Sequence, residues 1–120
     1  AVVERMGLGD VMTAPCAGLP AAVRRRVDLA RAVARRPRVL LLDEPAAGLG
    51  EAEKDSLAAQ IRRLAADGMA VVVVEHDMGF LLPLAGRLVA LDQGRVVASG
   101  VPSAVVNHPE VLGAYLGGSM

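Results

Sequence analysis

The chain has 120 residues, of which 53% are hydrophobic, and its 13 basic and 13 acidic side chains leave no formal net charge. This balance, with Phe80 and Tyr115 as the only aromatic residues, argues against a nucleic-acid-binding surface, which needs excess positive charge and stacking platforms. The single cysteine, Cys16, excludes an intramolecular disulfide and favours a reducing compartment. Charged residues interrupt the first twenty positions, and no apolar run reaches the roughly 20 residues of a membrane span, so we expect a cytoplasmic protein without signal peptide or transmembrane helix.

Three segments are predicted before the first strand: the end of a helix at residues 1–6, a loop rich in glycine and proline at residues 7–20, and a helix from Ala21 to Arg36. The last of these carries apolar residues at helical spacing, and Pro37 ends it. Arg24, Arg25 and Arg26 lie near its start. They form either a solvated face or contacts with acidic groups on a partner.

The stretch Val39–Glu44 is an apolar run that ends in two carboxylates and is followed by Pro45. Such a run predicts a strand that is buried on both faces, as in a parallel sheet. Its polar residues then lie at the carboxyl end, where ligands bind in open α/β sheets. Strand alternation directs Asp43 and Glu44 to opposite sides, so that one carboxylate can serve a Mg²⁺ ion and the other an attacking water. The alternative is a plain strand end with two solvated acids.

The remaining elements follow in alternation. Glu51–Asp67 is predicted to be a helix with Leu57, Ile61 and Leu64 as its apolar line, and Met69–Val74 is predicted to be a second strand, followed by Glu75-His76-Asp77. Strand, helix and strand form a right-handed parallel crossover. The later predictions are a short helix at Met78–Ala85, a hairpin of Arg87–Leu91 and Arg95–Ser99 around Asp92-Gln93-Gly94, and short helices at Pro102–Val106 and Pro109–Leu116. His108 is predicted to be an ordinary loop residue.

The motifs gain specificity from their order. They are the segments Leu19–Ala32, Pro37–Pro45, Ala46–Leu49, Val74–Met78 and Arg87–Gly117. This ordered set resembles the C-terminal part of an ABC transporter ATPase subunit, and the wordings DEPAAGL and VEHDM are similar to those of branched-chain amino acid importers. The resemblance covers nearly the whole chain. It implies an α/β fold of the P-loop NTPase type, with a parallel sheet, flanking helices, a short hairpin and C-terminal helices.

The resemblance also implies a role for each matching residue. Asp43 would be the Walker B aspartate that holds Mg²⁺ through water, and Glu44 would be the general base that activates the attacking water. His76 would be the switch histidine that contacts the γ-phosphate of ATP. The D-loop would be Ala47–Gly50, including Gly48, and would face a partner subunit. The signature motif that closes over ATP in the opposite subunit would be Leu19-Pro20-Ala21-Ala22-Val23.

The same resemblance implies partners, location and domain organisation. The expected partners are a second ATPase subunit and transmembrane permease subunits, without nucleic acid. The expected location is cytoplasmic and peripheral, at the inner face of the cell membrane. Residues 1–120 would be the C-terminal part of one ATPase domain, with the signature region and its helix in residues 1–36 and the Walker B segment onward in residues 37–120.

The sequence departs from the family pattern in two places. The family signature is Leu-Ser-Gly-Gly-Gln, whereas Leu19–Val23 lacks both glycines and the glutamine, so that methyl groups stand where backbone N–H groups approach a phosphate. No G-x-x-x-x-G-K-[ST] occurs in the 120 residues, and the only lysine, Lys54, lies in a predicted helix. We therefore expect these residues to be a fragment that binds ATP weakly or not at all alone.

In the family that the chain resembles, the strand that feeds the phosphate loop lies between the strands matching Met69–Val74 and Arg87–Leu91. The resemblance therefore implies that its absence would leave a gap there or force those two strands to pair. In both cases, apolar surface and strand edges would be exposed. The leading hypothesis is thus an ATP-hydrolysing importer subunit represented by its C-terminal part. An alternative is a non-catalytic, degenerate half-site that acts as a regulatory or docking module. A third possibility is an unrelated small α/β binding domain.

Overall fold

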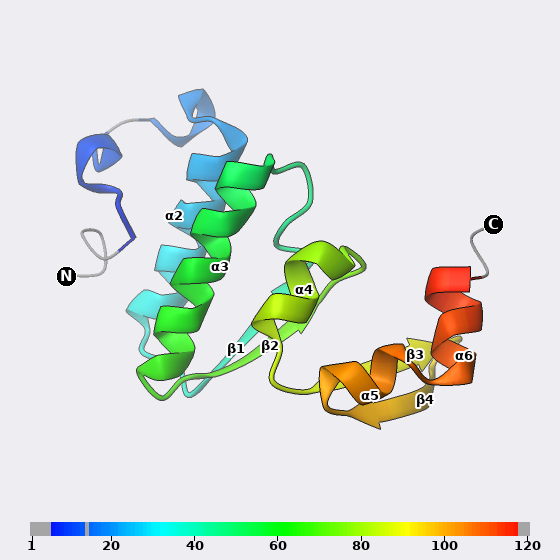
Figure 1. Ribbon diagram of the computed structural model, residues 1–120. Helices are drawn as coiled ribbons and strands as arrows, with labels where there is room; N and C mark the ends of the chain where they lie inside the picture. Colours follow the sequence, from blue (N-terminus) through cyan, green and yellow to red (C-terminus); the bar gives the residue numbers. More distant parts are fainter. Residues whose placement is uncertain (1–5, 14, 118–120) are drawn as a thin grey trace. The chain divides into compact units, whose positions relative to one another are not determined.

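The computed structural model describes residues 6–13 and 15–117. The chain divides into two compact units, Ala1–Leu81 and Leu82–Met120, which are described separately (Figure 1). The helix end that the sequence predicts at residues 1–6 falls, apart from Met6, outside the described residues. The proposed division of one ATPase domain into residues 1–36 and 37–120 refers to the whole domain of the family and stays a prediction.

The first unit contains a parallel strand pair and two long helices. After the 3₁₀ turns η1 (Gly9–Val11) and η2 (Cys16–Gly18), its elements are α2 (Ala21–Ala34), β1 (Val39–Asp43), α3 (Glu51–Ala66) and β2 (Ala70–Val74). The predicted helices and strands are confirmed, with ends that differ by one or two residues. β1 and β2 pair in parallel, with Val39 opposite Ala70 and Asp43 opposite Val74. The two strands therefore end together, at the same edge of the sheet.

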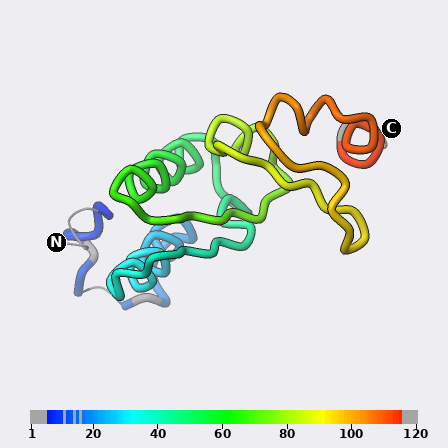
Figure 2. The backbone as a smooth tube through the Cα atoms, turned by 90° about the horizontal axis from the view of Figure 1, so that it is seen from below, coloured from blue at the N-terminus to red at the C-terminus, as the bar shows by residue number. Residues whose placement is uncertain are grey.

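The core of this unit lies on one side of the strand pair. Buried apolar side chains come from both helices and from β1: Leu29, Ala30, Val33, Leu40, Leu57, Ala58, Ile61 and Leu64. They include the predicted apolar line of α3. Along the strands, Leu40 is buried, whereas Leu41 is 73% exposed. Figures 1 and 2 show α2 and α3 beside the strands.

The prediction that Val39–Glu44 is buried on both faces is wrong for this chain. Val39, Leu41, Val72 and Val74 are each at least half exposed and form the open face of the β1–β2 pair. The physical reason is that the described residues of this unit supply helices for only one face. An apolar run is typical of a strand that is covered twice, so the second cover must come from polypeptide outside the described residues if it exists.

Specific backbone conformations end the helices. After α2, Arg36 takes a left-handed φ of +52° and its N–H bonds the Val33 carbonyl at 2.9 Å, before Pro37 prevents continuation. After α3, Gly68 has φ +99° and its N–H bonds the Ala65 carbonyl at 3.0 Å. Glycine adopts this conformation without steric cost and therefore closes the helix.

The short helix α4 (Met78–Leu84) follows β2 and crosses the boundary between the units. Asp77 caps its start, because its carboxylate Oδ1 accepts the Phe80 N–H at 3.1 Å. Phe80 and Leu81 are buried. Pro83 lies inside the helix near its end, so the predicted helix Met78–Ala85 is confirmed to within one residue.

The second unit is a hairpin with short helices. Strands β3 (Leu88–Asp92) and β4 (Arg95–Gly100) pair antiparallel around Gln93 and Gly94, which have φ values of +49° and +77°. Two positive φ values are typical of the I′ turn that joins twisted strands, so the predicted hairpin is confirmed. The helical segments that follow are α5 (Pro102–Val106), α6 (Pro109–Val111) and the π-helical turn η3 (Leu112–Gly117).

Two further predictions concern residues of this unit. The strand pairs that the described residues form are β1–β2 and β3–β4, each a separate two-stranded sheet. His108 is the N-cap of α6, and its Nδ1 accepts the Glu110 N–H at 3.3 Å, a more defined role than that of an ordinary loop residue. Among the described residues, no helix combines the length and apolarity that a membrane crossing requires.

Candidate functional site

The paired strands bring the two predicted catalytic side chains together. The Glu44 N–H bonds the Val74 carbonyl at 2.8 Å, so the chains stay in register one residue beyond β1. Two residues after β2, the His76 imidazole Nδ1 lies 3.2 Å from Glu44 Oε1. The Glu44 side chain is 53% exposed and the His76 side chain is 76% exposed. The contact therefore stands open to solvent at the carboxyl edge of the sheet.

Glu44 has an unusual backbone conformation. It lies beyond the last residue of β1 and takes φ +47°, the left-handed region that non-glycine residues rarely adopt. Strand alternation therefore does not decide where its side chain points, contrary to the reasoning from sequence. Its carbonyl accepts from the Ala47 N–H at 3.3 Å, which closes a turn. Strained conformations of this kind cluster at functional sites.

Arg25 of α2 holds the same turn from the other side. Its Nη1 donates to the Glu44 carbonyl at 3.2 Å and to the Pro45 carbonyl at 3.0 Å. Its neighbour Arg24 donates from Nε to the Leu19 carbonyl at 3.1 Å. Both arginines thus donate hydrogen bonds to backbone carbonyls of their own unit. Sequence reasoning missed this role of Arg25, because a backbone carbonyl twenty positions away leaves no signature in the sequence.

The residues on either side of His76 are also held. The Glu75 carboxylate accepts the Ala46 N–H at 3.0 Å, and the Lys54 ammonium lies 2.7 Å from the Asp77 carboxylate. The hydrogen bond from Lys54 lowers the pKa of Asp77 below its ordinary value. The hydrogen bond to Asp77 likewise raises the pKa of Lys54. Neither Glu75, Lys54 nor Asp77 was a candidate from sequence, although the charges that flank His76 were a visible signal.

The structure places the other predicted site residues at two separate positions. Pro20 precedes α2, and the residues of its first turn are Ala21, Ala22 and Val23, without a side-chain cap. Gly48 lies exposed in the loop before α3 with φ +76°. Within the described residues, no hydrogen bond joins these positions to Glu44 or His76.

Asp43 is the last residue of β1, and its side chain is exposed beside the Glu44 turn. The described part of the chain contains no group of three His, Cys, Asp or Glu side chains able to hold a metal ion. Magnesium is usually bound by one or two carboxylates together with water and substrate phosphates. A single carboxylate at the strand end therefore fits Mg²⁺ that is bound jointly with a nucleotide.

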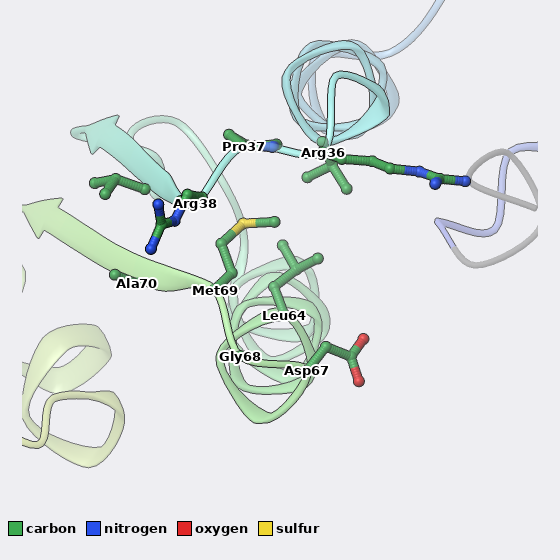
Figure 3. A pocket seen from close by; sticks show the side chains of 10 residues that line it. Arg36, Pro37, Arg38, Leu64, Asp67, Gly68, Met69 and Ala70 are labelled. Carbon is green, nitrogen blue, oxygen red and sulfur yellow. The ribbon is translucent and has the colours of Figure 1, made fainter.

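A groove of the first unit lies at the opposite edge of the sheet (Figure 3). It has a volume of about 870 Å³, and its lining includes Arg38, Met69 and Ala70, where the strands begin. In Figure 3 the side chains of Leu64 and Met69 point into this space. The first and last Cα atoms of a five-residue strand lie about 13 Å apart, so this groove is distinct from the site at Glu44 and His76.

Comparisons with known proteins show which proteins the chain is similar to. The family model described as branched-chain amino acid ATP-binding cassette transporter matches residues 95–119. The high-affinity branched-chain amino acid transport ATP-binding protein BraF of Pseudomonas aeruginosa is 36% identical over 116 residues, covering 96% of this chain and 46% of BraF. The zinc import ATP-binding protein ZnuC of Halorhodospira halophila is 37% identical over 120 residues, covering 97% of this chain and 46% of ZnuC.

Solved structures confirm the fold. A nucleotide-free ATP-binding cassette from an ABC transporter superposes with a TM-score of 0.89 at 22% identity, over 97% of this chain and 47% of that one. The cbiO1 protein of Clostridium perfringens superposes with a TM-score of 0.81 at 24% identity, over 96% and 47%. The chain thus spans about half the length of these relatives. Over the residues that it contains, the chain is similar to the C-terminal part of ABC transporter ATP-binding proteins, and its relatives include those of branched-chain amino acid transport.

Proposed function

We propose that this chain supplies the hydrolytic half of the ATP site in an ATP-binding and ATP-hydrolysing subunit of an ABC importer. The observation that carries the proposal is the 3.2 Å contact between Glu44 and His76 at two adjacent strand ends. The names of the BraF relative and the family model favour branched-chain amino acids as the solute. A relative that is named for zinc import shares a similar identity, so the names, rather than the chemistry of the site, support this solute.

Glu44 is the proposed general base and His76 the proposed phosphate contact. Phosphoryl transfer depends mainly on positioning and on stabilising charge on the phosphate oxygens. The open carboxylate of Glu44 can orient a water molecule and accept its proton. Because Nδ1 of His76 lies against Glu44, we assign the other ring nitrogen, Nε2, to the γ-phosphate. Mg²⁺, held by Asp43 through water, would neutralise phosphate charge when bound.

The phosphate-binding loop must come from polypeptide other than these residues. The sequence has no glycine-rich phosphate loop, and its only lysine is paired with Asp77. The open face of the β1–β2 pair offers an apolar surface for the polypeptide that carries the loop. We therefore predict that the 120-residue chain alone binds Mg-ATP weakly or not at all. Isothermal titration of the chain with Mg-ATP tests this, and a micromolar affinity would contradict it.

The assembly that we propose contains a second ATPase subunit and permease subunits, at the cytoplasmic face of the membrane. The support is similarity to ATP-binding proteins of ABC transporters, which are named as transport and import proteins. The first turn of α2 has no side-chain cap, so its first N–H groups lack an intrahelical partner, and helix N-termini favour anions. Such a turn suits the phosphates of a nucleotide that is bound to the second subunit.

A chimera tests the proposal directly. The 120 residues replace the matching 46% of the Pseudomonas BraF protein, and intact BraF serves as the control for phosphate release from Mg-ATP. We expect turnover in the chimera, and a loss of about 10²–10⁴-fold in Glu44→Gln, because the general base is removed. His76→Ala and Asp43→Asn should also lower turnover. Absence of turnover in a folded chimera that binds ATP, while intact BraF is active, would overturn the proposal.

The second candidate is a degenerate half-site that regulates or docks without hydrolysing ATP. It is favoured by one observation, the alanines at positions 21 and 22 in the uncapped first turn of α2. Their methyl groups stand where glycine would let a phosphate approach the backbone. In the chimera, the triple change Ala21→Gly, Ala22→Gly and Val23→Gln should then restore turnover that the unmodified chimera lacks. Measurable turnover by the unmodified chimera, at a rate that these changes do not raise, would remove this candidate.

A further inference from the structure

The Glu75 carboxylate connects two loops. Its Oε1 accepts the Ala46 N–H at 3.0 Å, and its Oε2 accepts the N–H groups of His76 at 3.1 Å and Asp77 at 3.3 Å. Ala46 is almost fully buried, with 2% exposure. One side chain therefore fixes the backbone at His76 to the start of the loop that follows Glu44. Each of these hydrogen bonds has a charged acceptor, which makes it stronger than a neutral one.

A second connection lies on the other side of His76. Lys54 Nζ lies 2.7 Å from Asp77 Oδ2, and the two side chains are only 20% and 30% exposed. The Lys54 N–H also bonds the Gly50 carbonyl at 2.9 Å, in the first turn of α3. Because the other oxygen of Asp77 caps α4 through Phe80, the carboxylate joins two helices. The Lys54 contact thus fixes the residue after His76 to the end of the same loop.

The loop between these two anchors contains residues 47–50, of which Ala47, Gly48 and Gly50 are exposed. Ala46 and Lys54, by contrast, are held by direct contacts to the two residues that flank His76. A displacement of the loop that shifts Ala46 or Lys54 is therefore transmitted to the His76 backbone through these two contacts. His76 in turn touches Glu44 through a single contact at 3.2 Å, so that a small movement changes this geometry.

We propose that Glu75 and Lys54 are positioning residues that couple the loop 47–50 to His76. This inference rests on the proposed function, since it assigns to the coupling the alignment of His76 with Glu44 for hydrolysis. Glu75 acts through the backbone N–H groups of Ala46 and His76, and Lys54 acts through Asp77. If the loop contacts a neighbouring subunit, a shift of the loop would through these contacts change the position of His76 relative to Glu44.

The first experiment measures the coupling on the 120-residue chain by NMR, without nucleotide. Gly48→Ala perturbs the loop, because its φ of +76° disfavours a side chain, although an added Cβ would meet no atom within 4 Å. We expect this change to shift the His76 imidazole signals. The shift should fall by at least half when Gly48→Ala is combined with Glu75→Ala or Lys54→Met. An undiminished shift in both combinations would overturn the coupling.

A matched control is available on the same lysine. Glu51 lies 3.6 Å from Lys54 Nζ but is 90% exposed and has no contact with the His76 segment among the described residues. Glu51→Ala should therefore leave the response of His76 to Gly48→Ala unchanged. Lys54→Arg keeps a cation that can reach Asp77 and should retain at least part of the response. An equal effect of Glu51→Ala and Lys54→Met would indicate a general charge effect and contradict the proposal.

The second experiment measures ATP turnover in the BraF chimera. Glu75→Ala and Lys54→Met should lower kcat by about 10–100-fold with little change in KM, since displacement of a catalytic group by about 1 Å costs on this scale. Glu51→Ala should stay within twofold of the unmodified chimera, and Lys54→Arg should recover part of the loss. A rise in KM with unchanged kcat would overturn the positioning role.

The two experiments separate the coupling from the proposed function. An inactive chimera with intact coupling in the NMR experiment would reject the function of the site and retain the mechanical link. An active chimera that loses turnover in Glu44→Gln, but not in Glu75→Ala or Lys54→Met, would support the function and reject the positioning role.

Discussion

The left-handed turn at Glu44 predicts an unusual order of stability among substitutions. Glu44→Ala and Glu44→Gly both remove the carboxylate and its contact with His76, so they differ in the backbone alone. A non-glycine residue in this conformation costs about 1–2 kcal/mol, whereas glycine costs about 0.5–1 kcal/mol through its freedom in the unfolded chain. The difference leaves Glu44→Gly more stable than Glu44→Ala by about 0.5–1 kcal/mol.

Urea unfolding of the two variants, followed by circular dichroism, measures this difference through the transition midpoints. Asp43 supplies the matched control, since it is an exposed acid in regular strand conformation one residue earlier. There the order should reverse, with Asp43→Ala more stable than Asp43→Gly. A Glu44→Gly variant that is no more stable than Glu44→Ala would refute the assignment of strain. In the chimera, Glu44→Gly should be as inactive as Glu44→Gln, because stability gained at the turn does not replace the base.

Four further predictions concern stability. Because the pKa of Asp77 is lowered in the folded chain, its contribution to the free energy of unfolding is complete above the unfolded-state pKa of about 3.9. This contribution is lost as the pH falls through the lower folded-state pKa. Urea unfolding from about pH 5 to pH 2 should therefore show a steeper loss of stability in the unmodified chain than in Asp77→Asn. The pKa of Lys54 is raised, so the pH dependence is reversed: its contribution to the free energy of unfolding is complete below about pH 10.4 and is lost at higher pH. Alkaline unfolding should therefore show a steeper loss of stability in the unmodified chain than in Lys54→Met. Ile61 is buried, with 3% exposure. Ile61→Ala should lower the free energy of unfolding, measured in urea, by about 2–5 kcal/mol, and Ile61→Val should lower it by about 0.5–1.5 kcal/mol. Gly94→Ala should lower the melting temperature, because φ +77° at the hairpin turn costs alanine about 1 kcal/mol, and an unchanged melting temperature would speak against the I′ turn.

Most elements could be predicted from the sequence because their signals are local. The apolar run at Val39 and the turn residues Gln93 and Gly94 depend on contacts between near neighbours, and the structure confirms the strand and the hairpin. Burial is different, since it depends on what packs against a surface. The face that carries Leu41 has the composition of an interior strand but is 73% exposed there, so composition indicates the environment of a complete domain rather than of these residues alone.

The site shows the same division. Polar residues after two parallel strands must lie at one edge of a sheet, which is why Glu44 and His76 could be predicted to meet. The contacts of Arg25 and Glu75 end on backbone carbonyl or N–H groups. Every residue offers such groups, so that no pattern of side chains indicates which one will be chosen. These supporting contacts became visible only when the register of β1 against β2 was known.

The open face of the β1–β2 pair links the folding of the chain to association. A polypeptide that binds this face of the folded chain, but does not bind the unfolded chain, raises the apparent free energy of unfolding by RT ln(1 + [L]/Kd), where [L] is its concentration. The increase is about 2.7 kcal/mol when [L] is 100 times Kd. Val39, Leu41, Val72 and Val74 would thereby make the melting temperature a function of partner concentration.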